Sequence, residues 1–375
     1  MAHLLTSLAH AACNPDSETG ALVPPIHPAT TYERDPDGSY PKGYKYSRDG
    51  NPTRRQLENT LAELEGGISC RAFSSGMAAS NAVIQSIPIG SHVLLPDDVY
   101  HGVRQLINEQ FQGRGIQVTA VDMTHLDDIE NAIRPNTGMI WVETPSNPLL
   151  QITDLSGVGQ IASKNDILFV VDGTWTTPFL QRPFEYGADL VVHSLTKYLG
   201  GHSDTLGGAV ITRADSERFE QLSKYQQQSG AVLDPFSSWL TLRGIRTLGV
   251  RLSHQCSTAR QVATFLETRS EVRVVHYPGL SSHPGHELAA KQMDDFGAML
   301  SFEADGGQDR AMAIAAAVKV FTRATSLGGT ESLIEHRASI EGPETKTSPS
   351  LLRVSIGLEH PKDLIEDLER SLIKS

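Results

Sequence analysis

The chain has 375 residues, and 44 aspartates and glutamates outnumber 32 lysines and arginines, which gives a formal net charge of −12. This acidic balance argues against a nucleic-acid-binding protein, because such proteins need a basic surface to neutralise phosphates. No run of about 20 apolar residues is present to span a membrane, and the N-terminus does not resemble a signal peptide. We therefore expect no nucleic-acid partner, no membrane association and a cytoplasmic location. Three widely separated cysteines predict neither a disulfide framework nor a metal site.

The N-terminal part of the chain predicts an arm followed by a helix. Residues 1–48 are rich in Pro, Gly, Asp, Ser and Tyr and show no sustained period, so they predict an ordered but irregular arm. The next segment predicts a helix over Gln56–Glu65, in which three leucines recur on one stripe before Gly66 and Gly67 end it.

Short apolar segments then alternate with helical patterns, which predicts a mainly parallel sheet covered on both faces in a large domain over residues 49–235. Helices are expected at Leu126–Ile133 and Leu155–Asn165. The strands expected from the apolar segments are His92–Leu95, Ile116–Val121, Met139–Glu143, Leu168–Asp172, Asp189–His193 and Gly208–Thr212.

After residue 235 the pattern changes to that of a smaller α+β domain over residues 236–375. Apolar residues at steps of three and four predict one long helix from about Leu242 to Leu266. Strand-like segments at 272–277, 298–304 and 352–358 alternate with helical patterns near 310–319 and 361–373. The polar, proline-containing segment Gly342–Ser350 predicts an exposed loop.

Two chemically active side chains are expected at neighbouring strand ends. One predicted strand ends at Asp172, and the next is followed by Ser194, Thr196 and Lys197. Ligands of open parallel sheets bind outside the carboxyl ends of the strands, so the acid and the lysine should lie close together. Taken alone, Asp172 could be a helix cap or a surface acid, and Lys197 could be a solvated lysine.

A third segment suggests a phosphate site. Ser74–Ala79 opens a helical stretch with small residues, and the free N–H groups at a helix start bind phosphate well, although close helix packing would also explain these residues. Pyridoxal phosphate needs such a phosphate site, a lysine, and a carboxylate that keeps its ring nitrogen protonated. The three features together therefore predict a pyridoxal-phosphate enzyme.

Nine segments occur in the order typical of one enzyme family. They are YKYSRDGNPTRRQLENTLAELEGG, SSGMAAS, DDVYHGV, ETPSNPLL, VVDGTWTTP, GADLVVHSLTKYLGGHSDTLGGAV, HPGHELAAKQM, SLGGTESLIEH and LLRVSIGLEHPKDLIEDLE. From about Thr31 to its end, the chain thus resembles the transsulfuration (Cys/Met metabolism) family. This resemblance implies a fold-type I pyridoxal-phosphate-dependent transferase fold, which is aminotransferase-like, with a mainly parallel central sheet and a smaller C-terminal α+β domain.

The resemblance also implies roles for individual residues. Lys197 would bind the cofactor covalently and move substrate protons, Asp172 would pair with the ring nitrogen, and Tyr100 would stack on the ring. Gly76, Met77, Thr174, Ser194 and Thr196 would complete the cofactor site, with Tyr46 and Arg48 reaching the site of a neighbouring subunit. Arg353, Asn147, Ser326 and Thr325 would contact the amino-acid substrate. A site shared in this way implies a homodimer, and the family commonly forms a dimer of dimers.

Several positions depart from the family pattern. Gly173 replaces a common Asn, and we expect little chemical effect. His101 follows the stacking tyrosine, where methionine γ-lyases have Gly and then Cys. Thr325 replaces a Glu that can receive the distal ammonium of cystathionine, and Arg337 stands where Pro is common. The segment at 340–343 reads Ile-Glu-Gly-Pro instead of Met-Thr-His-Ala, so that Glu341 could receive a cationic group instead.

The expected activity is γ-elimination or γ-replacement on a homoserine-derived amino acid, like that of cystathionine γ-lyase or γ-synthase. Elimination would give 2-oxobutanoate, ammonia and the leaving group. The alternatives are β-elimination, as in cystathionine β-lyase, and γ-cleavage of methionine or canavanine. A nicotinamide oxidoreductase is disfavoured, because Gly157 and Gly159 lie in an expected helix and lack the third glycine of a dinucleotide-binding loop.

Overall fold

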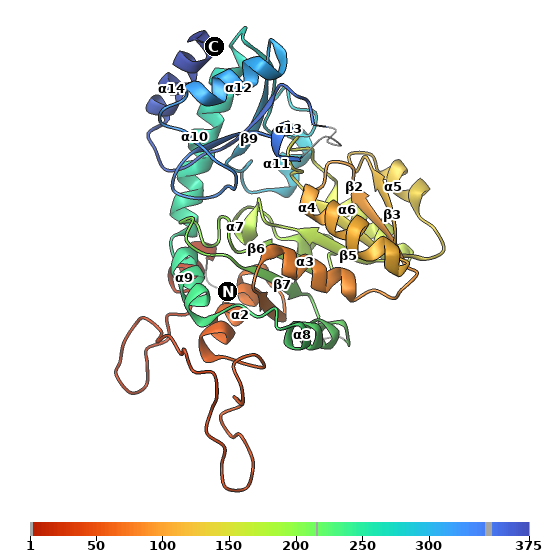
Figure 1. The fold of residues 1–375 in the computed structure, drawn as a ribbon, viewed down its shortest axis with the longest axis vertical. Coiled ribbons are helices and arrows are strands. Elements are labelled where there is room, and N and C mark those ends of the chain that lie inside the picture. Colours follow the sequence, from red (N-terminus) through yellow and green to blue (C-terminus); the bar gives the residue numbers. More distant parts are fainter. Residues whose placement is uncertain (1–2, 215–216, 342–346, 375) are drawn as a thin grey trace.

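The computed structural model describes residues 3–214, 217–341 and 347–374. Its centre is a seven-stranded sheet in the order β1-β7-β6-β5-β4-β2-β3 (Figure 1). The strands from β6 to β3 are parallel, whereas β7 runs antiparallel to both β6 and β1. The strands are β1 Ser69–Phe73, β2 His92–Pro96, β3 Gln117–Val121, β4 Thr137–Glu143, β5 Leu168–Asp172, β6 Leu190–Ser194 and β7 Gly208–Thr212. The six expected strands are therefore confirmed to within two residues at each end, and β1 is an additional edge strand that the sequence analysis missed.

Alternate residues of the central strands are buried on opposite faces of this sheet. In β5, Leu168 and Val170 join the apolar cluster under α3 and α4, whereas Phe169 and Val171 join the cluster under α5 and α6. Since both faces are covered, these strands are continuous apolar runs. The surrounding helices are α2 Pro52–Glu65, α3 Gly76–Gln85, α4 His101–Leu106, α5 Leu126–Ala132, α6 Leu155–Lys164, α7 Thr177–Leu180 and α8 Glu217–Ser229.

A second sheet of five strands, in the order β10-β11-β12-β9-β8, is formed by the C-terminal part of the chain. Its strands are β8 Val272–His276, β9 Met299–Ala304, β10 Thr322–Arg323, β11 Leu333–His336 and β12 Leu351–Ser355. The helices of this part are α9 Pro235–Ile245, α10 Leu248–Glu267, α11 His286–Gln292, α12 Gly307–Ala317, α13 Ala338–Glu341 and α14 Pro361–Lys374. Helices α10, α12 and α14 lie together on one side of it (Figure 1).

The single long helix expected from Leu242 to Leu266 is wrong, because the structure has two helices, α9 and α10, in its place. Gly244 lies so close to the lysine-bearing loop that a Cβ there would be 2.1 Å from the carbonyl oxygen of Gly200. The buried Arg251 donates hydrogen bonds of 2.9 Å from Nη2 to the carbonyl oxygens of Gly244 and Tyr198. These tertiary contacts end α9 although the apolar period continues through the break.

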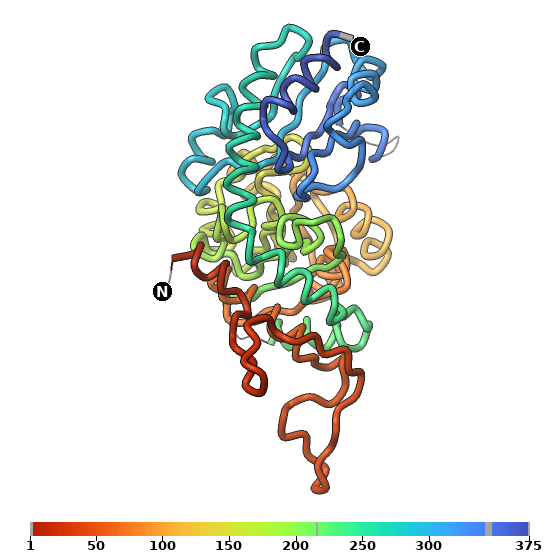
Figure 2. Tube along the Cα trace, turned by 90° about the vertical axis from the view of Figure 1, so that its left-hand side faces the viewer, coloured from red at the N-terminus to blue at the C-terminus, as the bar shows by residue number. Residues whose placement is uncertain are grey.

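The N-terminal segment is a short helix followed by an irregular arm. Helix α1, Leu4–Ala9, packs near α10, and the chain from there to α2 projects as loops beyond α2 and α9 (Figures 1 and 2). The arm is attached through hydrogen bonds from Asn51 Nδ2 to the carbonyl oxygen of His27 and from Trp239 Nε1 to that of Pro24. The domain boundaries after residues 48 and 235 stay a prediction.

Two further expectations concern absent features and the polar loop. No helix within the described ranges is long and apolar enough to cross a membrane. Over the same ranges, no three His, Cys, Asp or Glu side chains are grouped so as to hold a metal ion. Residues 342–346 of the loop Gly342–Ser350 lie outside the described residues, and the expectation of exposure is wrong at Ser350, which is buried next to β12.

The glycines of the discarded dinucleotide motif have a packing role in α6. A Cβ at Gly159 would lie 2.1 Å from the carbonyl oxygen of Tyr186. Gly159→Ala should therefore lower the free energy of unfolding by about 1–3 kcal/mol, because a backbone carbonyl cannot rotate away from the new methyl group. Gly113→Ala, where nothing lies within 4 Å of the added Cβ, should change it by less than about 0.5 kcal/mol. Urea unfolding followed by circular dichroism measures both, and equal stability of the two variants would contradict the packing role.

Candidate active site

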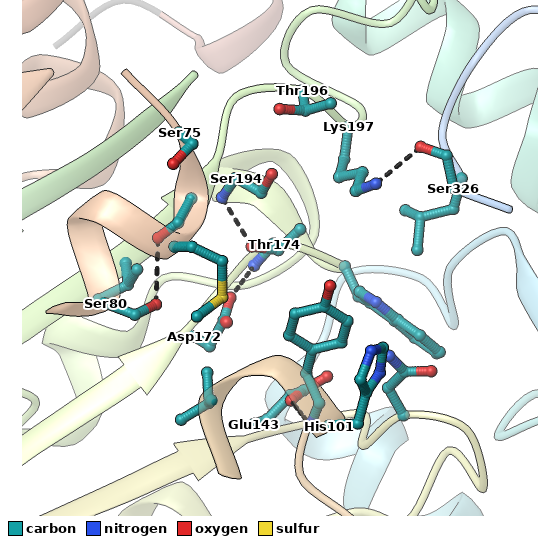
Figure 3. A pocket seen from close by; sticks show the side chains of 18 of the residues that line it. Ser75, Ser80, His101, Glu143, Asp172, Thr174, Ser194, Thr196, Lys197 and Ser326 are labelled. Atoms are coloured by element: carbon teal, nitrogen blue, oxygen red, sulfur yellow. Dashed lines mark hydrogen bonds between the residues drawn. The ribbon is translucent and has the colours of Figure 1, made fainter. Parts of the chain in front are cut away.

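One cavity at the carboxyl ends of β4, β5 and β6 collects twelve of the fourteen predicted site residues (Figure 3). The twelve are Gly76, Met77, Tyr100, Asn147, Asp172, Thr174, Ser194, Thr196, Lys197, Thr325, Ser326 and Arg353. They come from segments on both sheets that are far apart in the sequence. The cavity therefore lies where the strand-end rule predicts a ligand site, and Asp172 and Lys197 both line it.

Lys197 lies in the turn that follows β6, and its ammonium group donates a 2.7 Å hydrogen bond to Ser326 Oγ. Burial lowers the pKa of Lys197 to about 8, and the positive charge of Arg353 acts in the same direction. Ser326 has a φ of 88°, a left-handed conformation that is unusual for a serine and holds its hydroxyl at the lysine. With this pKa the ammonium form of Lys197 still predominates at physiological pH, but a much larger fraction is neutral amine than for an exposed lysine.

Asp172 ends β5 as a buried carboxylate facing the same cavity. Its Oδ1 accepts a 3.0 Å hydrogen bond from the backbone N–H of Thr174, and Thr174 Oγ1 accepts one of 2.9 Å from the N–H of Ser194. These bonds join the ends of β5 and β6 and fix the distance between the acid and the lysine turn. Burial raises the pKa of Asp172, whereas its hydrogen bonds with Thr174 lower it. A buried carboxylate of this kind favours a protonated ring nitrogen as its partner.

Glu143, at the end of β4, fixes the position of Tyr100. Its Oε2 accepts a 2.8 Å hydrogen bond from the backbone N–H of Tyr100, directly before α4. Burial raises the pKa of Glu143 well above its ordinary value, and the nearby carboxyl group of Asp172 adds to this effect. Tyr100 and Asp172 therefore line the same cavity, as the stacking role requires.

The start of α3 fits a phosphate group. Ser75 caps the helix by accepting a 3.1 Å hydrogen bond from the N–H of Ala78, and the N–H groups of Gly76 and Met77 belong to the first turn, where no acceptor exists within the helix. A Cβ at Gly76 would lie 3.1 Å from Ser194 Oγ. Glycine therefore keeps free the space between the start of α3 and the Ser194 hydroxyl, where a phosphate could bind. These residues fit the phosphate of pyridoxal phosphate.

Arg353, on β12, lines the same cavity and depends on a residue that the sequence analysis missed. Its Nη1 donates to Asn147 Oδ1 at 3.1 Å, and its Nη2 donates to the carbonyl oxygen of Ser326 at 3.1 Å and to Glu335 Oε2 at 2.8 Å. Glu335 pairs with Arg353 in the register of β11 and β12. Burial lowers the pKa of Arg353 to about 10, so it remains a cation at neutral pH and can bind a carboxylate.

Arg337 is the second guanidinium held by Glu335. Its Nη1 donates to the same Glu335 Oε2 at 2.8 Å, and its Nη2 donates to Glu341 Oε1 at 2.7 Å. Glu341 also accepts a 2.6 Å hydrogen bond from Thr347. The carboxylate suggested as a receptor for a cationic substrate group is therefore already paired with Arg337. The departures at Gly342 and Pro343 lie outside the described residues.

Tyr46 and Arg48 are the two predicted residues that this cavity does not include. They lie in the arm, where Tyr46 is 41% exposed and the guanidinium carbon of Arg48 is 5.5 Å from its ring centroid. Four further lining residues were not assigned to the site from the sequence: His101, Glu143, Trp175 and Arg337. Ser75 lies in the predicted phosphate segment Ser74–Ala79 but was given no role of its own, and the lining residues that were missed altogether are Ser80, Val103, Val192, Leu206 and Leu327. The sequence could have identified Ser75 as the residue that caps α3, because serine is preferred at the N-terminal cap of a helix.

The comparisons with known proteins cover nearly the whole chain. The family described as Cys/Met metabolism PLP-dependent enzyme matches residues 5–373. The chain is 45% identical to a cystathionine gamma-lyase of Bacillus subtilis, over 98% of both chains. It is 44% identical to a cystathionine beta-lyase of Lactococcus lactis subsp. cremoris over the full length of both. A solved cystathionine gamma synthase of Xanthomonas oryzae pv. oryzae, in complex with cystathionine, superposes with a TM-score of 0.95 at 40% identity, covering 100% of this chain and 98% of that one.

The lowered pKa of Lys197 can be measured in cofactor-free protein. The rate at which an amine-acylating reagent modifies Lys197, followed by peptide mass spectrometry, should rise with pH with a midpoint of about 8. In Arg353→Met the midpoint should move upward, because a cation that disfavours the charged lysine is lost and Glu335 is left less compensated. The exposed Lys42 in the same sample serves as an internal reference for the reagent. A wild-type midpoint near 10.5, or a downward shift in the variant, would contradict this electrostatic arrangement.

Proposed function

The chain belongs to the family of Cys/Met metabolism PLP-dependent enzymes, and we propose that it catalyses γ-elimination or γ-replacement on a γ-substituted amino acid derived from homoserine. Elimination yields 2-oxobutanoate, ammonia and the leaving group. The observation that carries the proposal is the pairing in one cavity of a lysine of lowered pKa, Lys197, with a carboxylate anchor, Arg353. The names of the relatives, a cystathionine gamma-lyase and a gamma synthase bound to cystathionine, support the same chemistry.

Pyridoxal phosphate, when bound, withdraws electrons from the substrate and so stabilises negative charge at the α-carbon. Gly76 and Met77 would offer backbone N–H groups to its phosphate, and Ser194 a hydroxyl. Asp172 would hold a proton on the ring nitrogen, and Tyr100 would cover one face of the ring. The free space at Gly76 and the buried carboxylate at Asp172 support this placement.

Proton movement is assigned to Lys197. Reaction at Cγ requires a proton to leave Cα and then Cβ, so one mobile base must reach both carbons. The neutral amine that the lowered pKa provides suits this task, and the Ser326 hydroxyl, 2.7 Å from Nζ, orients it. The lysine can return a proton to the substrate after the γ-substituent leaves, so one side chain serves as base and acid in turn.

Substrate recognition is assigned to the opposite end of the cavity. Arg353 would bind the α-carboxylate through its guanidinium fork, with Asn147 and the carbonyl oxygen of Ser326 fixing the fork in place. Thr325 lines the cavity with a neutral hydroxyl, so it supplies no charge for a distal ammonium group. Cystathionine is therefore one substrate among γ-substituted amino acids, which also include methionine and canavanine.

β-Elimination is the second candidate, because the relatives include a cystathionine beta-lyase that is 44% identical. It needs only the Cα proton to be removed, so the same lysine could serve it. In that case the keto acid formed from a β-substituted amino acid would be pyruvate rather than 2-oxobutanoate.

The arm supports a further proposal, that the active site is shared between subunits of a homodimer, two of which associate into a tetramer. Tyr46 and Arg48 lie outside the cavity of their own chain, on a segment that projects from the body (Figure 2). A guanidinium that has no place in its own chain's phosphate site is suited to the phosphate of a partner subunit.

Keto-acid analysis tests the proposed function. Purified enzyme incubated with cystathionine, O-substituted homoserines, canavanine and methionine should release 2-oxobutanoate from at least one of them, detected by chromatography of its hydrazone. Lys197→Ala should lose at least about 10³-fold in rate, because the base is removed. Release of pyruvate alone from β-substituted substrates would contradict the assignment to γ-chemistry.

Complementation tests the shared site. Arg48→Ala and Lys197→Ala subunits should each have little activity, and an equal mixture of the two should regain up to about one quarter of the wild-type activity, because about half of its dimers are hybrids and each hybrid keeps one of two sites intact. The estimate assumes random mixing of the two subunits. Mixtures that show no activity above the separate variants, or full activity in an isolated monomer, would rule out a role for Arg48 in a partner's site.

A further inference from the structure

His101 stands where two cavities meet. It is the first residue of α4 and lines the active-site cavity together with Tyr100 and Lys197. A second cavity, formed by the β2–α4 connection, α4 and residues 147–151, shares His101 and Asn147 with the first. His101 therefore faces both cavities.

The position of the imidazole along the cavity is set by Arg337. The Nη2 of Arg337 lies 3.4 Å from His101 Nδ1, while its Nη1 bonds to the carboxylate oxygen of Glu335 that also holds Arg353. His101 is thus linked to the carboxylate anchor through Arg337 and Glu335, and it lies at the substrate end of the cavity rather than at the start of α3.

The same contact fixes the tautomer of His101. A guanidinium has only donors, so Nδ1 must accept and the proton of the neutral ring must lie on Nε2. Burial and the charge of Arg337 lower the pKa of His101, which keeps the ring neutral, although Glu341 and Glu335 act in the opposite direction. Arg337 is only 2% exposed in its side chain and is held by two carboxylates, so this arrangement is rigid. The Tyr100 ring meets the imidazole edge-on, with ring centroids 4.7 Å apart.

We propose that His101 donates a hydrogen bond from Nε2–H to the heteroatom attached to Cγ of the substrate. When the bond between Cγ and this heteroatom breaks, its electron pair goes to the heteroatom, and the hydrogen bond stabilises the developing negative charge. The proton stays on Nε2, because a neutral imidazole is a donor of hydrogen bonds rather than an acid. This role rests on the proposed function, and it makes His101 a determinant of which leaving groups the enzyme accepts.

A binding comparison tests the contact without turnover. Homoserine carries a hydroxyl where norvaline carries a methyl group, and their inhibition constants can be measured by competition against a chromogenic amino-acid substrate or by changes in the cofactor spectrum. His101→Met removes the donor, whereas His101→Gln keeps an N–H at nearly the same reach and has the same length as the methionine. The preference for homoserine over norvaline should fall about five- to tenfold in His101→Met and be retained in His101→Gln.

A kinetic comparison tests the effect on the leaving group. In His101→Met, kcat should fall about 10- to 100-fold for the more basic oxygen leaving groups and much less for acidic ones, with little change in KM. Equal losses for all leaving groups in both variants, with an unchanged homoserine preference, would overturn the inference and leave His101 a packing residue. If wild-type enzyme released no 2-oxobutanoate while the binding preference still depended on the donor, the proposed γ-chemistry would fail and the contact itself would stand.

Discussion

The substrate end of the active site depends on one oxygen atom, Oε2 of Glu335, which accepts hydrogen bonds of 2.8 Å from both Arg337 and Arg353. Two guanidinium groups this close would repel each other in a buried site without the carboxylate between them. Removing one partner of such a buried pair costs about 3–5 kcal/mol, because an uncompensated charge remains. The carboxylate thus keeps Arg353 in place as an anchor, and the remaining positive charge lowers the pKa of the nearby Lys197 amine. Binding and proton transfer are therefore coupled through a residue that lies outside the cavity lining.

The alternation of β-strands explains how this charged group is buried. In the register of the second sheet, Glu335, Arg353 and Ser301 are cross-strand neighbours on β11, β12 and β9. Their neighbours in the chain, such as Ile334 and Val354, join the apolar cluster that includes α10 and α14. The polar row meets the loop after β4, where Ser301 Oγ donates a 2.8 Å hydrogen bond to the carbonyl oxygen of Pro148. The two sheets are joined at this row, so the same contacts that pack them together also build the substrate site.

The features that the sequence predicted best are those that depend on local pattern. Asp172 and Lys197 follow apolar strand runs, and the strand-end rule places them together without knowledge of distant contacts. Glu335 could not be found in this way, because its partnership with Arg353 depends on the register of two strands 18 positions apart in the chain. The break between α9 and α10 was missed for a similar reason, since it is made by Arg251 and by the approach of Gly244 to Gly200, while the apolar period runs on. The roles of Tyr46 and Arg48 came from family resemblance, and a single chain gives them no neighbour that would reveal those roles.

The central claim is that Lys197, set in this charged cavity, is the residue that binds pyridoxal phosphate covalently. Borohydride reduction of the purified, cofactor-loaded protein followed by peptide mass spectrometry tests it directly. We expect the visible absorption band to disappear on reduction and a pyridoxyl phosphate mass to appear on the peptide that contains Lys197. The Lys197→Ala variant should carry no such mass on any peptide. A modified lysine elsewhere, or a wild-type protein that stays colourless with the cofactor in excess, would contradict the account.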